Sequence, residues 1–304
     1  MSGESSSPMN GLELARSFFD GWGLPYLRSE FQQISERVAA FICGASQSLG
    51  NDDELSRDHG WGPGFGLVLT GEDMRRFGQR LRKALSKDIP KEWLGYKCPA
   101  SLPVNSIDQW FYRFIRRTHP PKTPRGWVKK AEFHLYMLRH APVFHDPLGE
   151  FTARRKEFWY YPHAAWLRRL ADESFNVWHF GQYNFLERLT HRKDPIAISI
   201  CLGSFIQATM KVCMLLEEDF TPYWKWLAAE FRKLPNVADL EARLSELSVC
   251  HELDRQAALV DVICKDIHAR LVARGLVIAN PTDHPHPLLC ASGELAGKAS
   301  ALKG

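Results

Sequence analysis

The spacing of apolar and polar residues changes character about halfway along the chain. In the first half, short apolar runs predict buried strands at 39–43, 65–70 and 102–106, and a short strand and turn at 142–150. Helical spacing predicts helices at 12–22, 25–38, 72–85 and 107–117. Thr70 and Glu72 indicate a capped start for the helix at 72–85. The first half is therefore predicted to mix α and β.

Helical periodicity dominates the second half. It predicts helices at 163–189, 195–218, 223–234, 237–247 and 252–274, with no strand pattern of comparable strength among them. We therefore predict an α+β fold with a small mixed sheet and flanking helices over residues 1–155, then an all-α bundle over 156–280. The composition of residues 281–304 predicts a loose tail.

Composition narrows the class of protein. The chain has 304 residues, of which 45% are hydrophobic, which is enough for a sizeable core. Its apolar runs are shorter than the roughly 20 residues that span a bilayer, and the N-terminus lacks the pattern of a secretory signal. A soluble cytoplasmic protein without a membrane partner is expected. Seven cysteines without a Cys-x-x-Cys pair predict free, mostly buried thiols.

Charge is informative mainly about ligands. The net charge of +4 is mild, so it is compatible with phosphate-bearing ligands. Nucleic acid is not an expected partner, because its binders usually carry a clustered basic stripe. Two basic clusters, 154–156 and 188–193, are interpreted as solvated helix ends, with an anionic substrate cleft as the alternative.

Most of the candidate ligand-binding residues lie in residues 41–69, FICGASQSLGNDDELSRDHGWGPGFGLVL. A strand that ends at Gly44 and Ser46 allows backbone N–H groups and a hydroxyl to approach phosphate oxygens. A carboxylate before the following strand, Asp58, is a suitable oxygen ligand for Mg²⁺. The order of these groups predicts a phosphate turn followed by a metal ligand.

The same residues carry a resemblance. Gly-Ala-Ser after a strand and Ser56-Arg57-Asp58 before the next one resemble the nucleotidyltransferase superfamily of DNA polymerase β and the aminoglycoside nucleotidyltransferases. The run SLGNDDELSRDHGWGPGF is more closely similar to the DUF4037 domain proteins, and VFHDPLGEFTARR and YWKW also fit them. The resemblance extends from about Phe31 to Phe231.

That resemblance implies an activity and a site. The activity is Mg²⁺- or Mn²⁺-dependent transfer of a nucleoside monophosphate from a nucleoside triphosphate to a hydroxyl of a small molecule or a protein. It implies that Asp58 is catalytic and binds metal, and that Gly44 and Ser46 bind the nucleotide. Asp108, after a later strand, is the candidate for a further catalytic carboxylate.

One position departs from the superfamily pattern. A second acidic residue usually stands two positions after the first, on the same strand face, and here that position is Gly60. Candidates to replace it are His59, which would point to the opposite face, and the acidic run 52–54, from which Asp53 is the metal-ligand candidate. The alternative function is a nucleotide-binding or regulatory module that kept the fold and lost transfer.

Two further motifs have competing interpretations. Lys225, between two tryptophans, is a candidate to bind the triphosphate of the nucleotide. The alternative, purely structural interpretation is that Pro222 begins a helix whose tryptophans pack in the core. Cys43 precedes Gly44 but has no His or Asp suitably spaced to activate it. It is therefore interpreted as the buried end of a strand.

Overall fold

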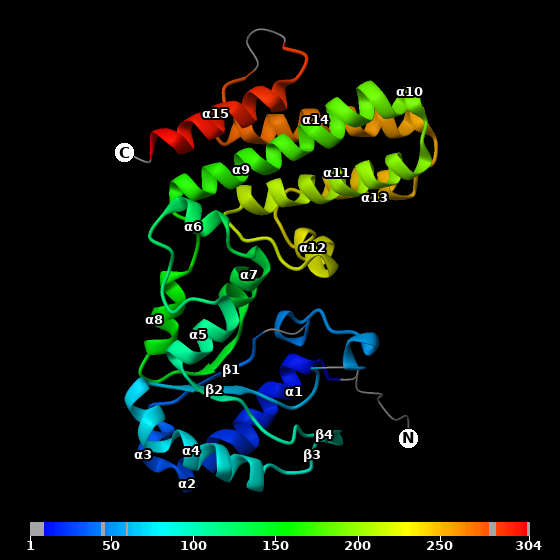
Figure 1. Ribbon diagram of the computed structural model, residues 1–304. Helices are drawn as coiled ribbons and strands as arrows, with labels where there is room; N and C mark the ends of the chain where they lie inside the picture. Colours follow the sequence, from blue (N-terminus) through cyan, green and yellow to red (C-terminus); the bar gives the residue numbers. More distant parts are fainter. Residues whose placement is uncertain (1–8, 44–45, 59, 280–283, 303–304) are drawn as a thin grey trace, which may run out of the picture. The chain divides into compact units, whose positions relative to one another are not determined.

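The computed structural model describes residues 9–43, 46–58, 60–279 and 284–302, without the side chains of Ser56 and Asp58. The chain divides into two compact units (Figure 1). The first contains Met1–Pro120 and Phe133–Trp159, and the second contains Pro121–Glu132 and Tyr160–Gly304. Each unit is described by itself below.

A small mixed sheet organises the first unit. Its strands are β1 (Ala39–Phe41), β2 (Gly66–Leu69), β5 (Val104–Ser106) and β6 (Val143–His145). They lie in the order β5-β2-β1-β6. Strand β1 is antiparallel to both β2 and β6, whereas β2 and β5 are parallel. The strands predicted from the apolar runs are thus confirmed with shorter bounds.

Helices cover both faces of this sheet (Figure 1). One face is covered by α1 (Gly11–Phe18), η1 (Phe19–Gly23), α2 (Leu24–Glu30), α3 (Gln32–Ser35) and α4 (Gly71–Asp88), and the other by α5 (Ile107–Ile115) and α8 (Glu150–Glu157). Neighbouring strand residues point to opposite faces. Ala40 accordingly joins the core cluster under α1 and α4, while Phe41 stacks on Phe151 of α8 with ring centroids 4.5 Å apart.

Local sequence explains how these elements begin and turn. Thr70 caps α4, because its hydroxyl accepts a hydrogen bond from the backbone N–H of Asp73 at 3.0 Å. A hairpin of β3 (Glu92–Trp93) and β4 (Tyr96–Lys97) turns through Leu94 and Gly95, both with positive φ. The helix α7 (Glu132–His140) precedes β6.

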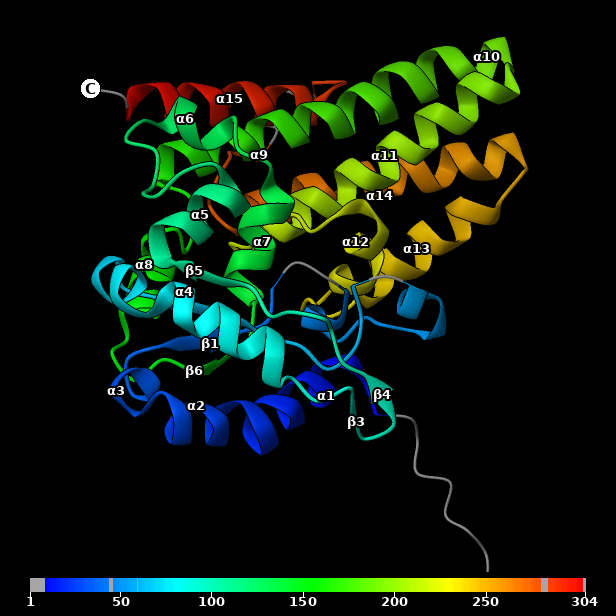
Figure 2. The ribbon, with the colours of Figure 1, turned by 60° about the horizontal axis from the view of Figure 1, so that its bottom comes forward.

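The second unit is built from helices joined by loops, with no strand among its described residues (Figure 2). Its elements are α6 (Pro124–Val128), α9 (His163–Trp178), η4 (His179–Leu189), α10 (Thr190–Arg192), α11 (Pro195–Leu216), α12 (Trp224–Phe231), α13 (Ala238–Val249), α14 (Leu253–Ala273) and α15 (Pro287–Ala301). With the mixed sheet of the first unit, this arrangement confirms the predicted α+β class.

The segment predicted as one α-helix over 163–189 has a different backbone in its second part. From His179 to Leu189 the structure is a π-helix, η4. It packs closely on neighbouring helices at Gly181, where a Cβ would come within 2.6 Å of the Phe205 ring and 2.9 Å of the Cys264 sulfur. The i→i+5 bonding was not predicted, because apolar spacing over so few turns does not separate π from α.

The prediction of a loose tail over 281–304 is wrong for most of that stretch. Residues 287–301 form α15, which buries Leu288, Leu295 and Ala299, and which packs along α9. The hydroxyl of Ser292 donates to the Ala171 carbonyl of α9 at 3.0 Å. The Pro- and His-rich approach to this helix obscured a clear signal, since apolar residues recur every three or four positions after Pro287.

One helix among the described residues is long and apolar enough to cross a membrane by length and composition. This is α11, whose best 18-residue window has a mean hydropathy of 1.6. A core helix of a soluble protein passes the same test, and α11 buries Phe205, Val212 and Leu215 inside the helical unit. The finding is weak evidence for a membrane span.

Candidate functional site

The loop between β1 and β2 is held by buried polar contacts. It contains two short 3₁₀ helices, η2 (Ser46–Leu49) and η3 (Glu54–Asp58). The side-chain amide of Gln47, only 3% exposed, accepts a hydrogen bond from the Gly62 N–H at 3.0 Å and donates to the Gly62 carbonyl at 3.2 Å. One side chain thereby fixes both backbone groups of a residue fifteen positions later.

A second anchor joins this loop to the start of α1. The Gly11 N–H and the Trp61 indole N–H both donate to Oδ2 of Asp52, each at 2.7 Å. Trp61 lies so close to Gly11 that a Cβ there would come within 2.5 Å of the indole nitrogen. On the ring face of Trp61, the guanidinium carbon of Arg57 lies 4.7 Å from the centroid. The acidic loop is therefore an ordered part of the first unit.

One oxygen in this anchor lacks a partner. Oδ1 of Asp52 is buried and accepts no hydrogen bond from the described residues, although Oδ2 of the same carboxylate accepts two. A buried acceptor left unpaired is costly. Carboxylate oxygens are also the ligands that Mg²⁺ prefers, so this atom is compatible with a bound cation.

Asp58 does not adjoin the strand that follows it. The backbone of Asp58 ends the 3₁₀ helix η3, and β2 begins only at Gly66. Between them Gly60 and Gly62 have φ of +67° and +126°, values that place this stretch in turns and not in an extended strand. Gly60 therefore does not share a strand face with Asp58, because the alternation of side chains along a strand does not apply to this stretch.

Several predicted site residues lie at the margin of what the structure describes. Gly44, His59 and the side chain of Asp58 lie outside the described residues. Ser46 begins η2, and its carbonyl accepts from the Asn51 N–H at 3.2 Å. Asp53 is exposed on the loop. The predicted phosphate turn and metal carboxylate thus remain predictions.

Asp108 takes no part in the contacts described above that hold the loop between β1 and β2. Asp108 lies in the first turn of α5 with its side chain 64% exposed, and its carboxylate accepts from the Arg154 guanidinium of α8 at 2.7 Å. Among the side chains the structure describes, no three His, Cys, Asp or Glu groups gather as a metal site. A role for Asp108 as third carboxylate requires that this ion pair open.

Lys225 belongs to the second unit, whereas Gly44 and Ser46 belong to the first. Its ammonium lies 4.8 Å from the ring centroid of Trp226, in α12. The expectation that both neighbouring tryptophans are core residues is wrong for Trp224, which is 66% exposed. The exposed aromatic and the lysine are consistent with either a stacking surface or a solvated helix start.

The cysteines behave as expected from their spacing. All seven are free, and Cys98, Cys201, Cys213 and Cys264 are buried. Burial raises the pKa of Cys43 to about 12, and its sulfur contacts the Met137 carbonyl at 3.6 Å. A thiol with this pKa is a poor nucleophile near neutral pH, which agrees with its interpretation as a strand end.

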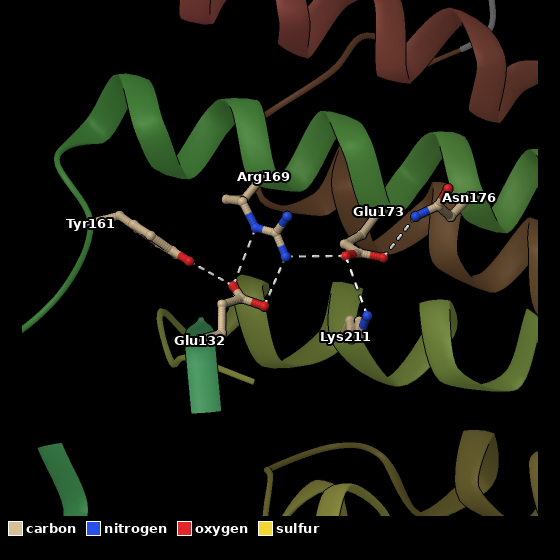
Figure 3. A network of polar contacts seen from close by, with 6 residues as sticks. All are labelled: Glu132, Tyr161, Arg169, Glu173, Asn176 and Lys211. Carbon is tan, nitrogen blue, oxygen red and sulfur yellow. Dashed lines mark hydrogen bonds and ion pairs between the residues drawn. The ribbon is translucent and has the colours of Figure 1, made fainter. Parts of the chain in front are cut away.

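A buried ionic network in the second unit was missed by the sequence analysis (Figure 3). Arg169 of α9 donates to Glu132 at 2.8 Å and to Glu173, one helical turn along α9, at 3.3 Å. The hydroxyl of Tyr161 also donates to Glu132 at 2.7 Å, and Lys211 of α11 lies 3.6 Å from Glu173. Glu132 and Glu173 are almost fully buried, with side chains 9% and 5% exposed.

The charges in this network compensate one another. Burial alone would lower the pKa of Arg169, but the carboxylates of Glu132 and Glu173 outweigh it and raise that pKa. Burial raises the pKa of the Tyr161 hydroxyl, and the charge of Glu132 adds to this effect. Only the Arg169–Glu173 pair was visible in the sequence as an i, i+4 pattern, since Glu132 is distant along the chain.

Comparison with known proteins gives a partial assignment. Residues 127–227 match the family model of a domain of unknown function, DUF4037, which confirms the resemblance over that stretch. The matched stretch includes every residue of the buried ionic network. No protein with a curated description matches the sequence.

The chain is also similar to solved structures at low identity. It aligns with a nucleotidyltransferase-like protein from Exiguobacterium sibiricum at 8% identity, covering 92% of this chain and 89% of that one, with a TM-score of 0.40. A likeness this low carries no residue roles from one protein to the other. What the comparisons identify in this chain is a DUF4037 segment over residues 127–227.

Proposed function

We propose that this protein is a Mg²⁺-dependent nucleotidyltransferase that moves a nucleoside monophosphate from a nucleoside triphosphate to a hydroxyl of a small molecule or a protein. The observation that carries the proposal is the anchored acidic loop between β1 and β2. It combines backbone held in place at Gly11 and Gly62 with a buried carboxylate oxygen on Asp52 that accepts no hydrogen bond from the described residues. A loop fixed in this way can present ligands without being ordered by the substrate first.

The residues of this loop fit a divalent cation by their chemistry. Asp53 and Asp58 would hold the ion, and Asp52 Oδ1 offers another oxygen of the kind that Mg²⁺ prefers. When bound, the ion would neutralise charge on the phosphates and favour deprotonation of the acceptor hydroxyl. Gly44 and Ser46 would bind the phosphates through backbone N–H groups and a hydroxyl.

The proposal is tested without knowing the acceptor. The protein is incubated with each α-³²P-labelled nucleoside triphosphate, Mg²⁺ and a panel of small hydroxyl acceptors, and pyrophosphate release and the labelling of the acceptors and of the protein itself are measured. We expect Mg²⁺-dependent turnover that falls at least about a hundredfold in Asp58→Asn, because a lost metal carboxylate costs several kcal/mol of transition-state stabilisation. Turnover that is unchanged in Asp58→Asn would refute the assignment.

The resembled superfamily usually has an acidic residue two positions after the first, and the glycine at position 60 keeps a second candidate open, a nucleotide-binding module without transfer. This reading predicts that nucleotide raises the melting temperature equally with Mg²⁺ and with EDTA, and that no pyrophosphate is released. A rise in melting temperature that requires Mg²⁺ would contradict it.

Position 60 also offers a direct test of the missing carboxylate. A Cβ at Gly60 would meet nothing within 4 Å, and aspartate is among the residues that tolerate a φ of +67°. Gly50 is a matched control, since it lies in the same loop with the same φ and equally open surroundings. If a second metal carboxylate limits the rate, Gly60→Asp should accelerate turnover on the order of tenfold or more, whereas Gly50→Asp and Gly60→Asn should not. Equal effects of Gly60→Asp and Gly50→Asp would mean that position 60 has no special relation to the metal.

A further inference from the structure

A basic groove lies in the first unit, outside the loop just described. Its volume is about 570 Å³, and it is lined by the second half of α4, the segment that enters β5, the first two residues of β5 and one residue of α5. Three of the lining side chains are cations, Arg82, Lys83 and Arg113, and among the residues that the structure describes no aspartate or glutamate lines it. The remaining lining includes neutral donors such as Gln79 and Ser101.

The two arginines are fixed by neutral acceptors. Nε and Nη2 of Arg82 donate to the Val104 carbonyl at 3.0 and 2.6 Å. Nη1 of Arg113 donates to the side-chain oxygen of Asn105, a residue only 4% exposed, at 3.0 Å. Since a carbonyl and an amide carry no net charge, the contacts hold both guanidinium groups in place without neutralising them.

The topology of the sheet explains why Arg82 is held there. Strand β5 is the edge strand in the order β5-β2-β1-β6, and the Pro103 carbonyl accepts from the Leu67 N–H of β2 at 2.9 Å. Carbonyls alternate in direction along a strand, so the next one, on Val104, faces the open edge. Arg82 satisfies it and at the same time brings a positive charge to the groove.

Helix ends alone do not account for this arrangement. Lysine and arginine are favourable in the last turns of helices because of the helix dipole. Lys87 in the last turn of α4 follows that preference and lies outside the groove. The additional feature of Arg82, Lys83 and Arg113 is that they converge from two helices on one concave surface that contains no carboxylate.

We propose that this groove binds the phosphate group of a small molecule, as a phosphate monoester or a polyphosphate chain. Guanidinium groups match phosphate oxygens in geometry and charge, and the volume is in the range of small-molecule sites. The basic surface is too local for nucleic acid, which needs many phosphate contacts along an extended stripe. This site does not depend on Mg²⁺ or on Asp58.

The test is an NMR titration of the full chain in EDTA at constant ionic strength, with orthophosphate, inorganic pyrophosphate and ATP as separate probes. We expect saturable amide shifts at 79–86 and 101–106. If orthophosphate has the lowest dissociation constant, the ligand is a phosphate monoester. If pyrophosphate or ATP has the lowest one, the ligand carries a polyphosphate chain. Lys83→Gln should raise the dissociation constant about tenfold, since it removes one charge-assisted contact. Lys87→Gln is the matched control and should leave it unchanged.

Three results would overturn the proposal. The first is the absence of saturable shifts in the groove with all three probes. The second is a set of shifts confined to residues 46–62, which would place the anion in the loop. The third is equal weakening by Lys83→Gln and Lys87→Gln, which would indicate attraction by net charge only. Thermal unfolding of both variants establishes that each is folded, and Lys83→Arg should restore binding.

Discussion

Replacing Arg169 by methionine should strongly destabilise the helical unit. Methionine keeps much of the length of the side chain but removes the guanidinium that Glu132 and Glu173 share (Figure 3). Both carboxylates would stay buried, and Lys211, at 3.6 Å from Glu173, would remain as a cation near one of them. The loss is therefore that of a partner in a buried ion pair.

The magnitude follows from burial. Removing one partner of a buried ion pair costs about 3–5 kcal/mol, because the other charge is left uncompensated. The neighbouring Arg168→Met is a matched control, since Arg168 pairs with Asp172 at 2.9 Å on the same helix but is 53% exposed. An exposed i, i+4 pair contributes about 0.3–0.5 kcal/mol. The two substitutions should thus differ by at least about 2.5 kcal/mol in the free energy of unfolding.

Hydrogen exchange of amides in α9 and α11 measures this difference in the second unit alone. Arg169→Met should accelerate exchange on the order of a hundredfold, with little change in Arg168→Met. Adding Glu132→Gln and Glu173→Gln to Arg169→Met should recover part of the loss, because the buried charges are then removed as well. Similar exchange in the two single variants would refute the reasoning, and so would a further loss in the triple variant.

Two other predictions concern packing and thiol chemistry. Gln47→Leu should lower the free energy of unfolding by about 2–4 kcal/mol in urea titrations, because the N–H and carbonyl of Gly62 would be buried without partners. Gln47→Glu keeps the acceptor for the Gly62 N–H and should lower the free energy of unfolding less. Equal decreases in the two variants would contradict this account. Iodoacetamide at pH 8 should label exposed Cys290 quickly and leave Cys213 unmodified until urea is added. Burial raises the pKa of Cys213 to about 12, so only roughly one thiol in ten thousand is ionised at pH 8, and rapid labelling of Cys213 in the folded protein would contradict its burial.

The sequence was sufficient for elements whose periodicity extends over several turns or strands. Strand β2 and helices α4 and α14 lie within three residues of their predicted bounds, since burial of one face imposes the period that the sequence displays. The cap at Thr70 was equally readable, because a capping hydroxyl acts within three residues.

The features that escaped prediction depend on distant contacts or on backbone geometry. Glu132 reaches Arg169 across 37 residues, and no local pattern encodes that meeting. The left-handed conformation of Gly60 separates Asp58 from β2, whereas the glycine itself was interpreted only as a missing ligand. In both cases residue identity was informative, but the fold determined what the residue does.

The open surroundings of Gly60 have a genetic consequence. Every glycine codon becomes an aspartate or glutamate codon when its middle base changes from G to A. Since a Cβ at this position meets nothing within 4 Å, the packing of the loop does not oppose such a change. A point mutation would therefore suffice to give or remove a carboxylate here; the φ of +67° strains either acidic side chain, and aspartate less than glutamate, because aspartate is enriched in the left-handed region.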